Sequence, residues 1–238
     1  KFGDEIRDDT PLARARDRQL DEIVTLLEKA AGDKPRSVSA ERKAPPTRER
    51  EIEDAMMKIC HRGDIKAALE MIEQHPDIAQ AGLYEAVHQN HPELVRILLE
   101  RGAKATTPWR WACWYTPLMH SLRYSQPRYE IAQLLVDHGV DPNETNGMGM
   151  TTLHIVAGQG TVDAARWLLD RGADIHARDR EFDSTPLAWA ARAGREDMVR
   201  FLLSRGASVV HPDDEPWATS VAWARRRNHA NLVSILGG

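Results

Sequence analysis

Apolar residues recur with helical spacing through most of the chain. In four stretches they occupy positions i, i+1, i+3 and i+4, which places them on one face of a helix and not on alternating sides of a strand. The four sets are Leu94, Val95, Ile97 and Leu98; Ile131, Ala132, Leu134 and Leu135; Ala164, Ala165, Trp167 and Leu168; and Met198, Val199, Phe201 and Leu202. Each stretch therefore predicts an amphipathic helix.

The four stretches belong to a tandem repeat of about 34 residues. A repeat of fixed length is typical of a small number of folds, so its length indicates the fold. One marker is a short start led by threonine. Its third residues are Leu118, Leu153, Leu187 and Val221, which lie 35, 34 and 34 residues apart. A second marker is the glycine that follows each amphipathic stretch, at Gly102, Gly139, Gly172 and Gly206, with spacings of 37, 33 and 34. Two independent markers with one period indicate a repeated structural unit.

The polar positions of the repeat predict where helices begin and end. Thr116 and Thr185 precede proline, which suits a helix N-cap followed by the first helical residue. In four repeats a residue that tolerates positive φ lies between the two expected helices and predicts a tight turn there. These turn residues are Asn90, Gly160, Gly194 and Asn228. Each repeat is therefore a short first helix, a turn and an apolar-faced second helix.

These marks together resemble the ankyrin repeat. The resemblance is carried by the segment 185–191, Thr-Pro-Leu-Ala-Trp-Ala-Ala, followed by Gly194, Met198-Val199, Leu202-Leu203 and Gly206-Ala207, and the pattern covers residues 52–238. It implies an all-α solenoid of antiparallel helix pairs with β-hairpin fingers. It also implies that the fingers and first helices form a concave surface to which partners bind.

The repeat pattern divides the chain into three segments. Residues 51–238 form the array of about six repeats, beginning with a shortened cap repeat over 52–78 and ending with the repeat from Thr219. Residues 32–50 are charged and contain proline, which predicts a linker. Residues 1–31 form an isolated ankyrin-like repeat: either it closes an earlier array, or it stacks on the main array with the linker looped outside. The first residue is Lys1 and not Met, from which we expect a processed N-terminus.

Composition limits the expected partners and the expected cellular location. The net charge of −4 argues against nucleic acid as a partner, because phosphate binding needs a surplus of Lys and Arg. The two cysteines, Cys60 and Cys113, are too few for a disulfide framework, and we expect them to be buried thiols in the cytoplasm. No run of about 18 apolar residues is present, so no membrane span is expected.

No catalytic or cofactor motif is present, so we expect neither an enzyme nor a cofactor. The segment 141–147 is similar to the start of a calcium loop, but its twelfth position is Thr152, so a finger turn is expected. The acidic segment 211–215 is expected to be a solvated finger tip and not a metal site. Histidines near helix starts and turns are expected to bond backbone groups; they are His91, His120, His154 and His229.

Partner contacts are predicted at two places. The first is a stripe at the ends of the first helices, consisting of His88, Gln89, Arg123, Tyr124, Gln159, Arg192, Arg226 and Arg227. The second is the finger over 104–115, where Trp109, Arg110 and Trp111 combine residue types enriched in interface hot spots. Of the other tryptophans, Trp114 and Trp217 are expected to pack between fingers. Trp189 and Trp223 are expected to pack between repeats.

The leading functional hypothesis is a protein–protein interaction module, either a scaffold or a regulatory subunit. The alternative is an inhibitor or immunity-type protein that occludes the active site of a partner enzyme, with the acidic residues 213–215 as a polyanion mimic. Nucleic-acid binding through Arg192, Arg225, Arg226 and Arg227 is a third hypothesis, which the negative net charge disfavours.

Overall fold

The computed structural model describes residues 48–106, 115–123 and 126–237. The chain divides into two compact units, residues 1–46 and residues 47–238, and all described residues belong to the second. The predicted isolated repeat over 1–31, most of the predicted linker, and Trp109, Arg110, Trp111, Cys113, Trp114 and Tyr124 lie outside the described residues.

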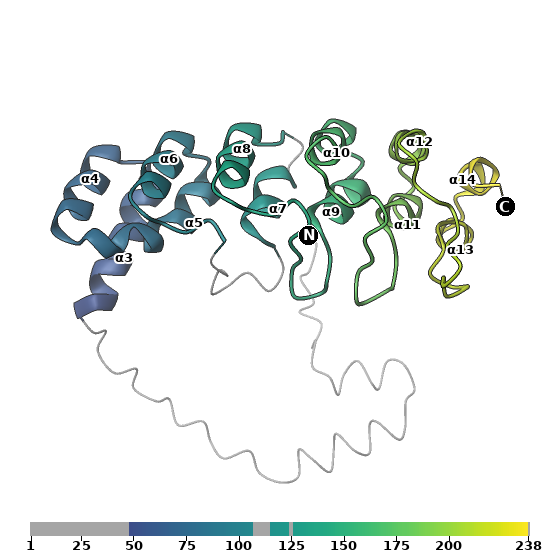
Figure 1. Cartoon of the computed structure of the whole chain (residues 1–238), viewed down its shortest axis with the longest axis horizontal. Helices are drawn as coiled ribbons and strands as arrows, with labels where there is room; N and C mark the ends of the chain where they lie inside the picture. Colours follow the sequence, from purple (N-terminus) through teal and green to yellow (C-terminus); the bar gives the residue numbers. More distant parts are fainter. Residues whose placement is uncertain (1–47, 107–114, 124–125, 238) are drawn as a thin grey trace, which may run out of the picture. The chain divides into compact units, whose positions relative to one another are not determined.

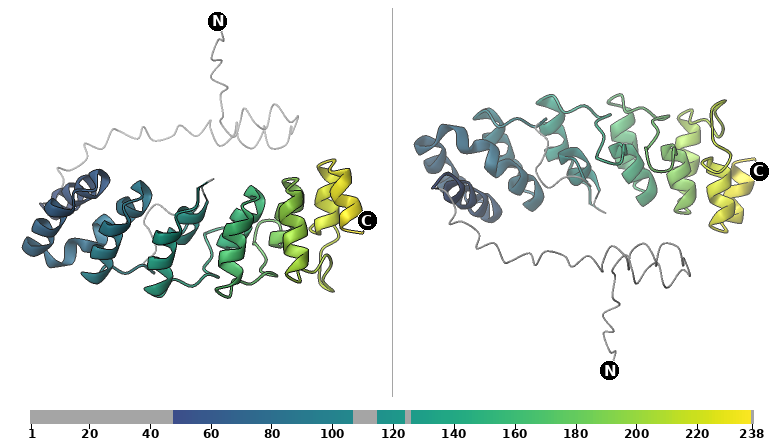
Figure 2. Two further views of the ribbon diagram at one scale, coloured as in Figure 1. Left: turned by 90° about the horizontal axis from the view of Figure 1, so that it is seen from above. Right: turned by 90° about the horizontal axis from the view of Figure 1, so that it is seen from below.

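The second unit is a stack of helix pairs, which confirms the predicted all-α repeat architecture. Its first helices are α3 (Arg48–Arg62), α5 (Ala79–Gln89), α7 (Pro117–Leu122), α9 (Thr152–Gln159), α11 (Pro186–Arg192) and α13 (Ser220–Arg226). Its second helices are α4 (Ile65–Gln74), α6 (Pro92–Glu100), α8 (Tyr129–Asp137), α10 (Val162–Leu169), α12 (Glu196–Ser204) and α14 (Ala230–Ile235). Helix α3 begins within the stretch assigned to the linker. Each first helix packs against the next, and the second helices form a parallel row (Figures 1 and 2).

Threonine N-caps start the first helices as predicted. The side chain of Thr185 accepts a hydrogen bond from the amide of Ala188 at 3.3 Å, and Thr116 and Thr219 do the same three residues on. Thr151 forms a capping box, in which His154 Nδ1 lies 3.1 Å from the Thr151 amide. These bonds satisfy amides that would otherwise lack a partner at the helix start.

Four turns between paired helices have the predicted left-handed backbone. Asn90 has a φ of 64° and Gly160 a φ of 86°, and Gly194 and Asn228 share this conformation. A side chain of the following repeat covers two of these turns. A Cβ atom on Gly194 would lie 2.8 Å from the ring of His229, so the turn fits closely against the next repeat.

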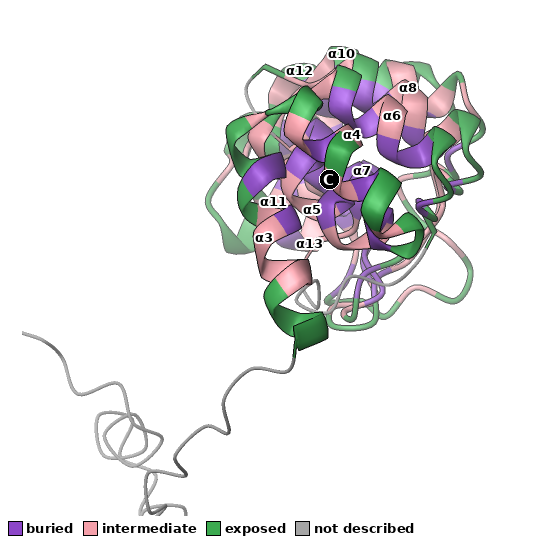
Figure 3. Cartoon of the chain, turned by 90° about the vertical axis from the view of Figure 1, so that its left-hand side faces the viewer, coloured by how far each residue is buried: buried purple, intermediate pink, exposed green. Residues whose placement is uncertain are grey.

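One apolar core runs through the stack, between the two rows of helices (Figure 3). Three of the four predicted apolar positions in each second helix are fully buried, for example Leu94, Val95 and Leu98 in α6. The third position of each set is only half-buried; these residues are Ile97, Leu134, Trp167 and Phe201. They lie at the edge of the buried face, since i+3 is rotated away from the centre of the stripe set by i, i+1 and i+4.

The β-hairpins implied by the resemblance are not confirmed in the described parts of the fingers. In the part of the chain that is described, the β pairing consists of one isolated bridge between Thr145 and Thr151. Side chains satisfy the finger amides instead. Asn146 Oδ1 accepts bonds from two backbone amides, and the Asp179 carboxylate accepts three, from Glu181, Phe182 and Ser184. These turns leave few amides for a ladder. The fingers project from the first-helix side of the stack (Figure 1).

The first-helix ends are bound to the next repeat by long polar side chains. Arg128 Nη1 donates to the carbonyls of Val87 and His88 at 2.9 and 2.8 Å, and Arg195 Nε donates to Gly158 O at 3.1 Å. His229 Nε2 lies 3.3 Å from Arg192 O in the equivalent place. The last carbonyls of a helix need such partners. The same contacts hold the exposed ends of the first helices in register.

Candidate functional site

The predicted stripe lies on one side of the stack. His88 and Gln89 end α5, Arg123 follows α7, Gln159 ends α9, Arg192 ends α11, and Arg226 and Arg227 end and follow α13. Because α5, α7, α9, α11 and α13 pack side by side in chain order, these residues form a continuous surface, which we call the first-helix face.

The α5 end of this face is occupied by an internal polar network. Gln89 Nε2 lies 2.9 Å from Glu85 Oε1, and His61 Nδ1 lies 2.6 Å from the same oxygen. Partial burial opposes ionisation of Glu85, yet the hydrogen bonds from His61 and Gln89 lower the pKa of that carboxyl. His88 stacks on His120 with ring centroids 4.8 Å apart. The side chains of His88 and Gln89 are thus already engaged within the protein.

The C-terminal half of the face carries an aromatic cluster around Arg192. The Phe182 ring meets Trp189 and Trp223 edge-on, at centroid distances of 5.9 and 5.5 Å. The Arg192 guanidinium lies over Phe182, Trp223 and Trp189 at 4.4, 4.6 and 5.0 Å. Arrangements of this kind are attractive cation–π contacts. They hold the guanidinium in one place on the surface.

Hydrogen bonds fix both tryptophans of this cluster between repeats, as predicted. Trp189 Nε1 donates to Asp179 Oδ2 at 2.9 Å, and Trp223 Nε1 donates to Ser184 Oγ at 2.9 Å. Trp223 is only 6% exposed. Trp217 differs from its prediction: it is 43% exposed and does not pack between fingers.

Three arginines of the first-helix face form no ion pair with a described residue. Among the described residues, no ion pair involves Arg192, Arg226 or Arg227, whereas Arg178, Arg200 and Arg205 all pair with carboxylates. Partial burial and the neighbouring charge of Arg227 lower the pKa of Arg192, although Glu181 and Asp179 act in the opposite direction. Two neighbouring cations that form no ion pair with a described carboxylate favour binding of an anion.

A pocket of about 380 Å³ opens beside these arginines. It lies between α9 and α11, and its lining includes Tyr115, Ile155, Gly158, Trp189, Arg192 and Arg227. Gly158 occupies the position at which other repeats carry His88, Arg192 or Arg226. The missing side chain leaves space over the Trp189 ring. Because the pocket has apolar walls and two arginines, it suits a ligand with an apolar group and a negative charge.

Sequence reasoning found Gln159, Arg192 and Arg227 of this pocket but missed Tyr115 and Gly158 as lining residues. The signal for Gly158 is present in the aligned repeats, since a glycine replaces a long polar residue there. Tyr115 lies two residues before α7, and the repeat spacing does not reveal that its side chain lines the pocket.

The predicted structural histidines bridge neighbouring repeats. His154 is completely buried, and its Nε2 lies 3.0 Å from Ser184 O in the next finger. Burial lowers the pKa of His154. His91 Nε2 lies 3.3 Å from His61 O. The rings of His91, His154 and His229 thus contact backbone carbonyls as predicted, whereas His120 stacks on His88.

The acidic finger segments are tied by internal bonds. Asp141 Oδ1 accepts from the amide of Asn143 at 2.8 Å, which makes the predicted finger turn. Arg178 pairs with Asp183, Asp213 and Asp214. Its guanidinium therefore neutralises part of the negative charge of the acidic fingers. Within the described ranges, no group of three His, Cys, Asp or Glu side chains is placed to hold a metal.

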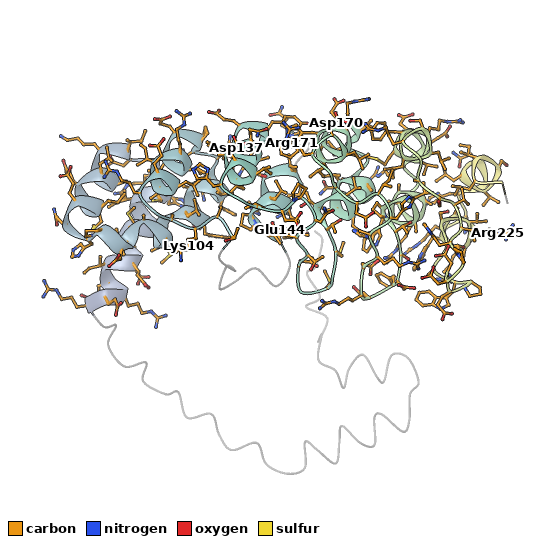
Figure 4. All side chains as sticks on the ribbon, in the orientation of Figure 1. Lys104, Asp137, Glu144, Asp170, Arg171 and Arg225 are labelled. Carbon is orange, nitrogen blue, oxygen red and sulfur yellow. The ribbon has the colours of Figure 1, made fainter. Side chains whose placement is uncertain are left out.

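Other charged groups are spread over the second-helix row. Asp137, Asp170 and Arg171 lie on that side of the stack, whereas Arg225 lies beside α13 (Figure 4). Arg205 pairs with Asp170 at 2.8 Å, and Arg171 Nη2 donates to Gln133 at 2.6 Å. None of the described helices is both long and apolar enough to cross a membrane.

Comparisons with known proteins agree with this architecture. A family profile described as ankyrin repeats in three copies matches residues 55–146 and 118–213. The B-cell lymphoma 3 protein homolog of Mus musculus is 32% identical over 123 residues, which are 50% of this chain and 27% of that relative. The chain thus aligns with only a minor part of that protein's length. With the profile covering more than half of the chain and the helix pairs stacked as described, the chain belongs to the ankyrin-repeat family, whose repeats serve as protein-interaction modules.

Proposed function

We propose that this chain is a scaffold or regulatory subunit that binds another protein through its first-helix face and its fingers, and that it catalyses no reaction. The contacts we assign to the helix face are His88, Gln89, Arg123, Tyr124, Gln159, Arg192, Arg226 and Arg227. The observation that carries the proposal is the group of arginines at the ends of α11 and α13. In the described part of the chain, Arg192, Arg226 and Arg227 form no ion pair with a carboxylate, and Arg192 and Arg227 line one pocket.

We assign a second contact to the finger at Trp109, Arg110 and Trp111. Its support is the residue types alone, since Trp and Arg dominate the energetics of many interfaces. A finger contact and a helix-face contact on one partner would reinforce each other.

The test is capture of a partner from a lysate by the intact chain, followed by mass spectrometry. We expect Arg192→Ala with Arg227→Ala to remove most of the captured protein, and Trp109→Ala with Trp111→Ala to weaken capture. Arg200→Ala is the matched control, because Arg200 is an exposed second-helix residue paired with Glu196. Equal capture by the control and all four substitutions would contradict the proposed surface.

The alternative function, inhibition of a partner enzyme through the acidic finger, has one supporting observation. The Asp213 side chain is 81% exposed and presents a carboxylate to solvent. Its charge is partly offset by Arg178, which weakens it as a polyanion mimic. Loss of activity of a captured enzyme on adding the chain, and its recovery with Asp213→Asn, would favour this function over the first.

We further propose a cytoplasmic location, supported by a buried free thiol. Cys60 is completely buried, and desolvation followed by the charge of Glu85 raises its pKa to about 12. Such a thiol is unreactive and packs as a small apolar group. Fractionation of cells producing the chain tests the location directly.

A further inference from the structure

We propose that the partner presents an acidic segment to the first-helix face, with a carboxylate between Arg192 and Arg227 and an adjacent large apolar side chain in the pocket over Gly158. This inference rests on the proposed function and specifies the chemistry of the partner.

The pocket provides the apolar half of the site. The aromatic rings of Tyr115 and Trp189 and the side chain of Ile155 line it, and its volume of about 380 Å³ accommodates a leucine or an aromatic side chain. Gly158 keeps it open. A Cβ atom at this position would lie 3.6 Å from Trp189 Cε3, within van der Waals contact, so any longer side chain there would enter the pocket.

The two arginines provide the anionic half. Arg192 and Arg227 both line the pocket, and neither has a carboxylate partner in the described structure. The carboxylates whose charges act on Arg192 are those of Glu181 and Asp179, and Asp179 already accepts bonds from Trp189 Nε1 and from finger amides. A carboxylate from outside would therefore relieve the repulsion between the two cations. Stacking of Arg192 on Phe182 and Trp223 positions its guanidinium in advance.

A short acidic segment fits better than a nucleic acid. The neighbouring finger carries Asp213, Asp214 and Glu215, and the whole chain has a net charge of −4, so an extended polyanion would meet repulsion beyond the two arginines. The pocket also needs an apolar side chain close to the charge, which acidic peptide motifs supply.

The experiment is a selection of random dodecapeptides displayed on phage against the intact chain, followed by affinity measurement with the enriched peptides made synthetically. We expect enrichment of Asp or Glu next to Leu, Phe or Trp. Arg192→Gln or Arg227→Gln should weaken binding of these peptides about tenfold or more, as loss of a charged hydrogen bond does. Arg200→Gln, with the same change of charge on a second helix, should leave affinity unchanged.

Gly158→Leu is the second variant, because it fills the pocket without removing a charge. We expect it to abolish binding of the selected peptides while the helical signal and the unfolding midpoint are retained. Enrichment of neutral or basic peptides, no enrichment at all, or binding that survives Gly158→Leu would overturn the inference. Tight binding of a 20-nucleotide single-stranded DNA with no acidic peptide enriched would overturn it as well.

The two levels of proposal fail separately. If lysate capture depends on Arg192 and Arg227 but the selected peptides are not acidic, the binding face stands and the partner chemistry is wrong. If neither capture nor peptide binding depends on those arginines, both proposals are wrong.

Discussion

At the scale of single residues, two glycines of the first-helix row have opposite roles. Gly158 lies within α9 with an ordinary helical backbone, and a Cβ atom there would make only an ordinary contact with Trp189, whereas Gly194 has a φ of 69° and lies under the ring of His229. The sequence alone distinguishes them only in part. The repeat period marked Gly194 as a turn residue, but the pocket at Gly158 depends on the neighbouring Trp189 and Tyr115, which no local pattern specifies.

The pair gives a matched prediction. Gly158→Ala should raise the free energy of unfolding by about 0.5–1 kcal/mol, because alanine favours a helix interior. Gly194→Ala should lower it by about 1–2 kcal/mol, since the left-handed backbone disfavours a Cβ atom. Urea denaturation followed by circular dichroism measures both, and changes of the same sign would contradict the assignment of the two positions.

His120 makes stability depend on pH. Burial, followed by the charges of His88, Arg123 and Arg128, lowers its pKa from 6.5 to about 4. The unfolded chain therefore takes up the proton first. Stability is fully present above about pH 6.5 and declines as the pH falls toward 4, by on the order of 2–3 kcal/mol from this residue.

The check is the unfolding free energy of the protein and of His120→Gln between pH 7.5 and 4.5. We expect the variant to have the smaller slope. Some slope should remain, because burial lowers the pKa of His154 in the same direction. Identical slopes would show that His120 is not the titrating group.

At the scale of helices and fingers, the sequence predicted what local chemistry determines. Threonine caps, left-handed turns and buried helix faces all follow from residue type and period, and they were confirmed. The β-hairpin form of the fingers was not confirmed in the described residues, where the side chains of Asn146 and Asp179 accept bonds from finger amides. Trp217 was placed wrongly, since its exposure depends on how the last finger folds.

Contacts between helices of adjacent repeats should contribute measurably to stability. Arg128→Ala removes bonds to the carbonyls of Val87 and His88, and we expect it to cost about 1.5–3 kcal/mol, as for charged hydrogen bonds. Arg200→Ala removes an exposed pair with Glu196 and should cost about 0.5 kcal/mol or less. Equal costs in urea denaturation would contradict the role assigned to Arg128.

At the scale of the whole array, each repeat is stabilised mainly by its neighbours. Removing residues 205–238 deletes α13 and α14 together with the Trp223 bond to Ser184. We expect the shortened chain to keep its helical signal per residue and to unfold at a lower denaturant concentration. Complete loss of helix would instead indicate one indivisible core.

The same architecture explains how the proposed binding surface arises from neighbouring repeats. One row of helices and the fingers are free to vary at their exposed ends while the buried positions repeat. In this chain that freedom is used at Gly158, Arg192 and Arg227, which neighbouring repeats bring together at one pocket.

The most direct test of this account is hydrogen exchange of the intact chain with and without its captured partner, followed by mass spectrometry of peptides. We predict slower exchange on partner binding at the ends of α9, α11 and α13, with α10 and α12 unchanged. Protection confined to the second helices, with the first-helix ends unaffected, would contradict it.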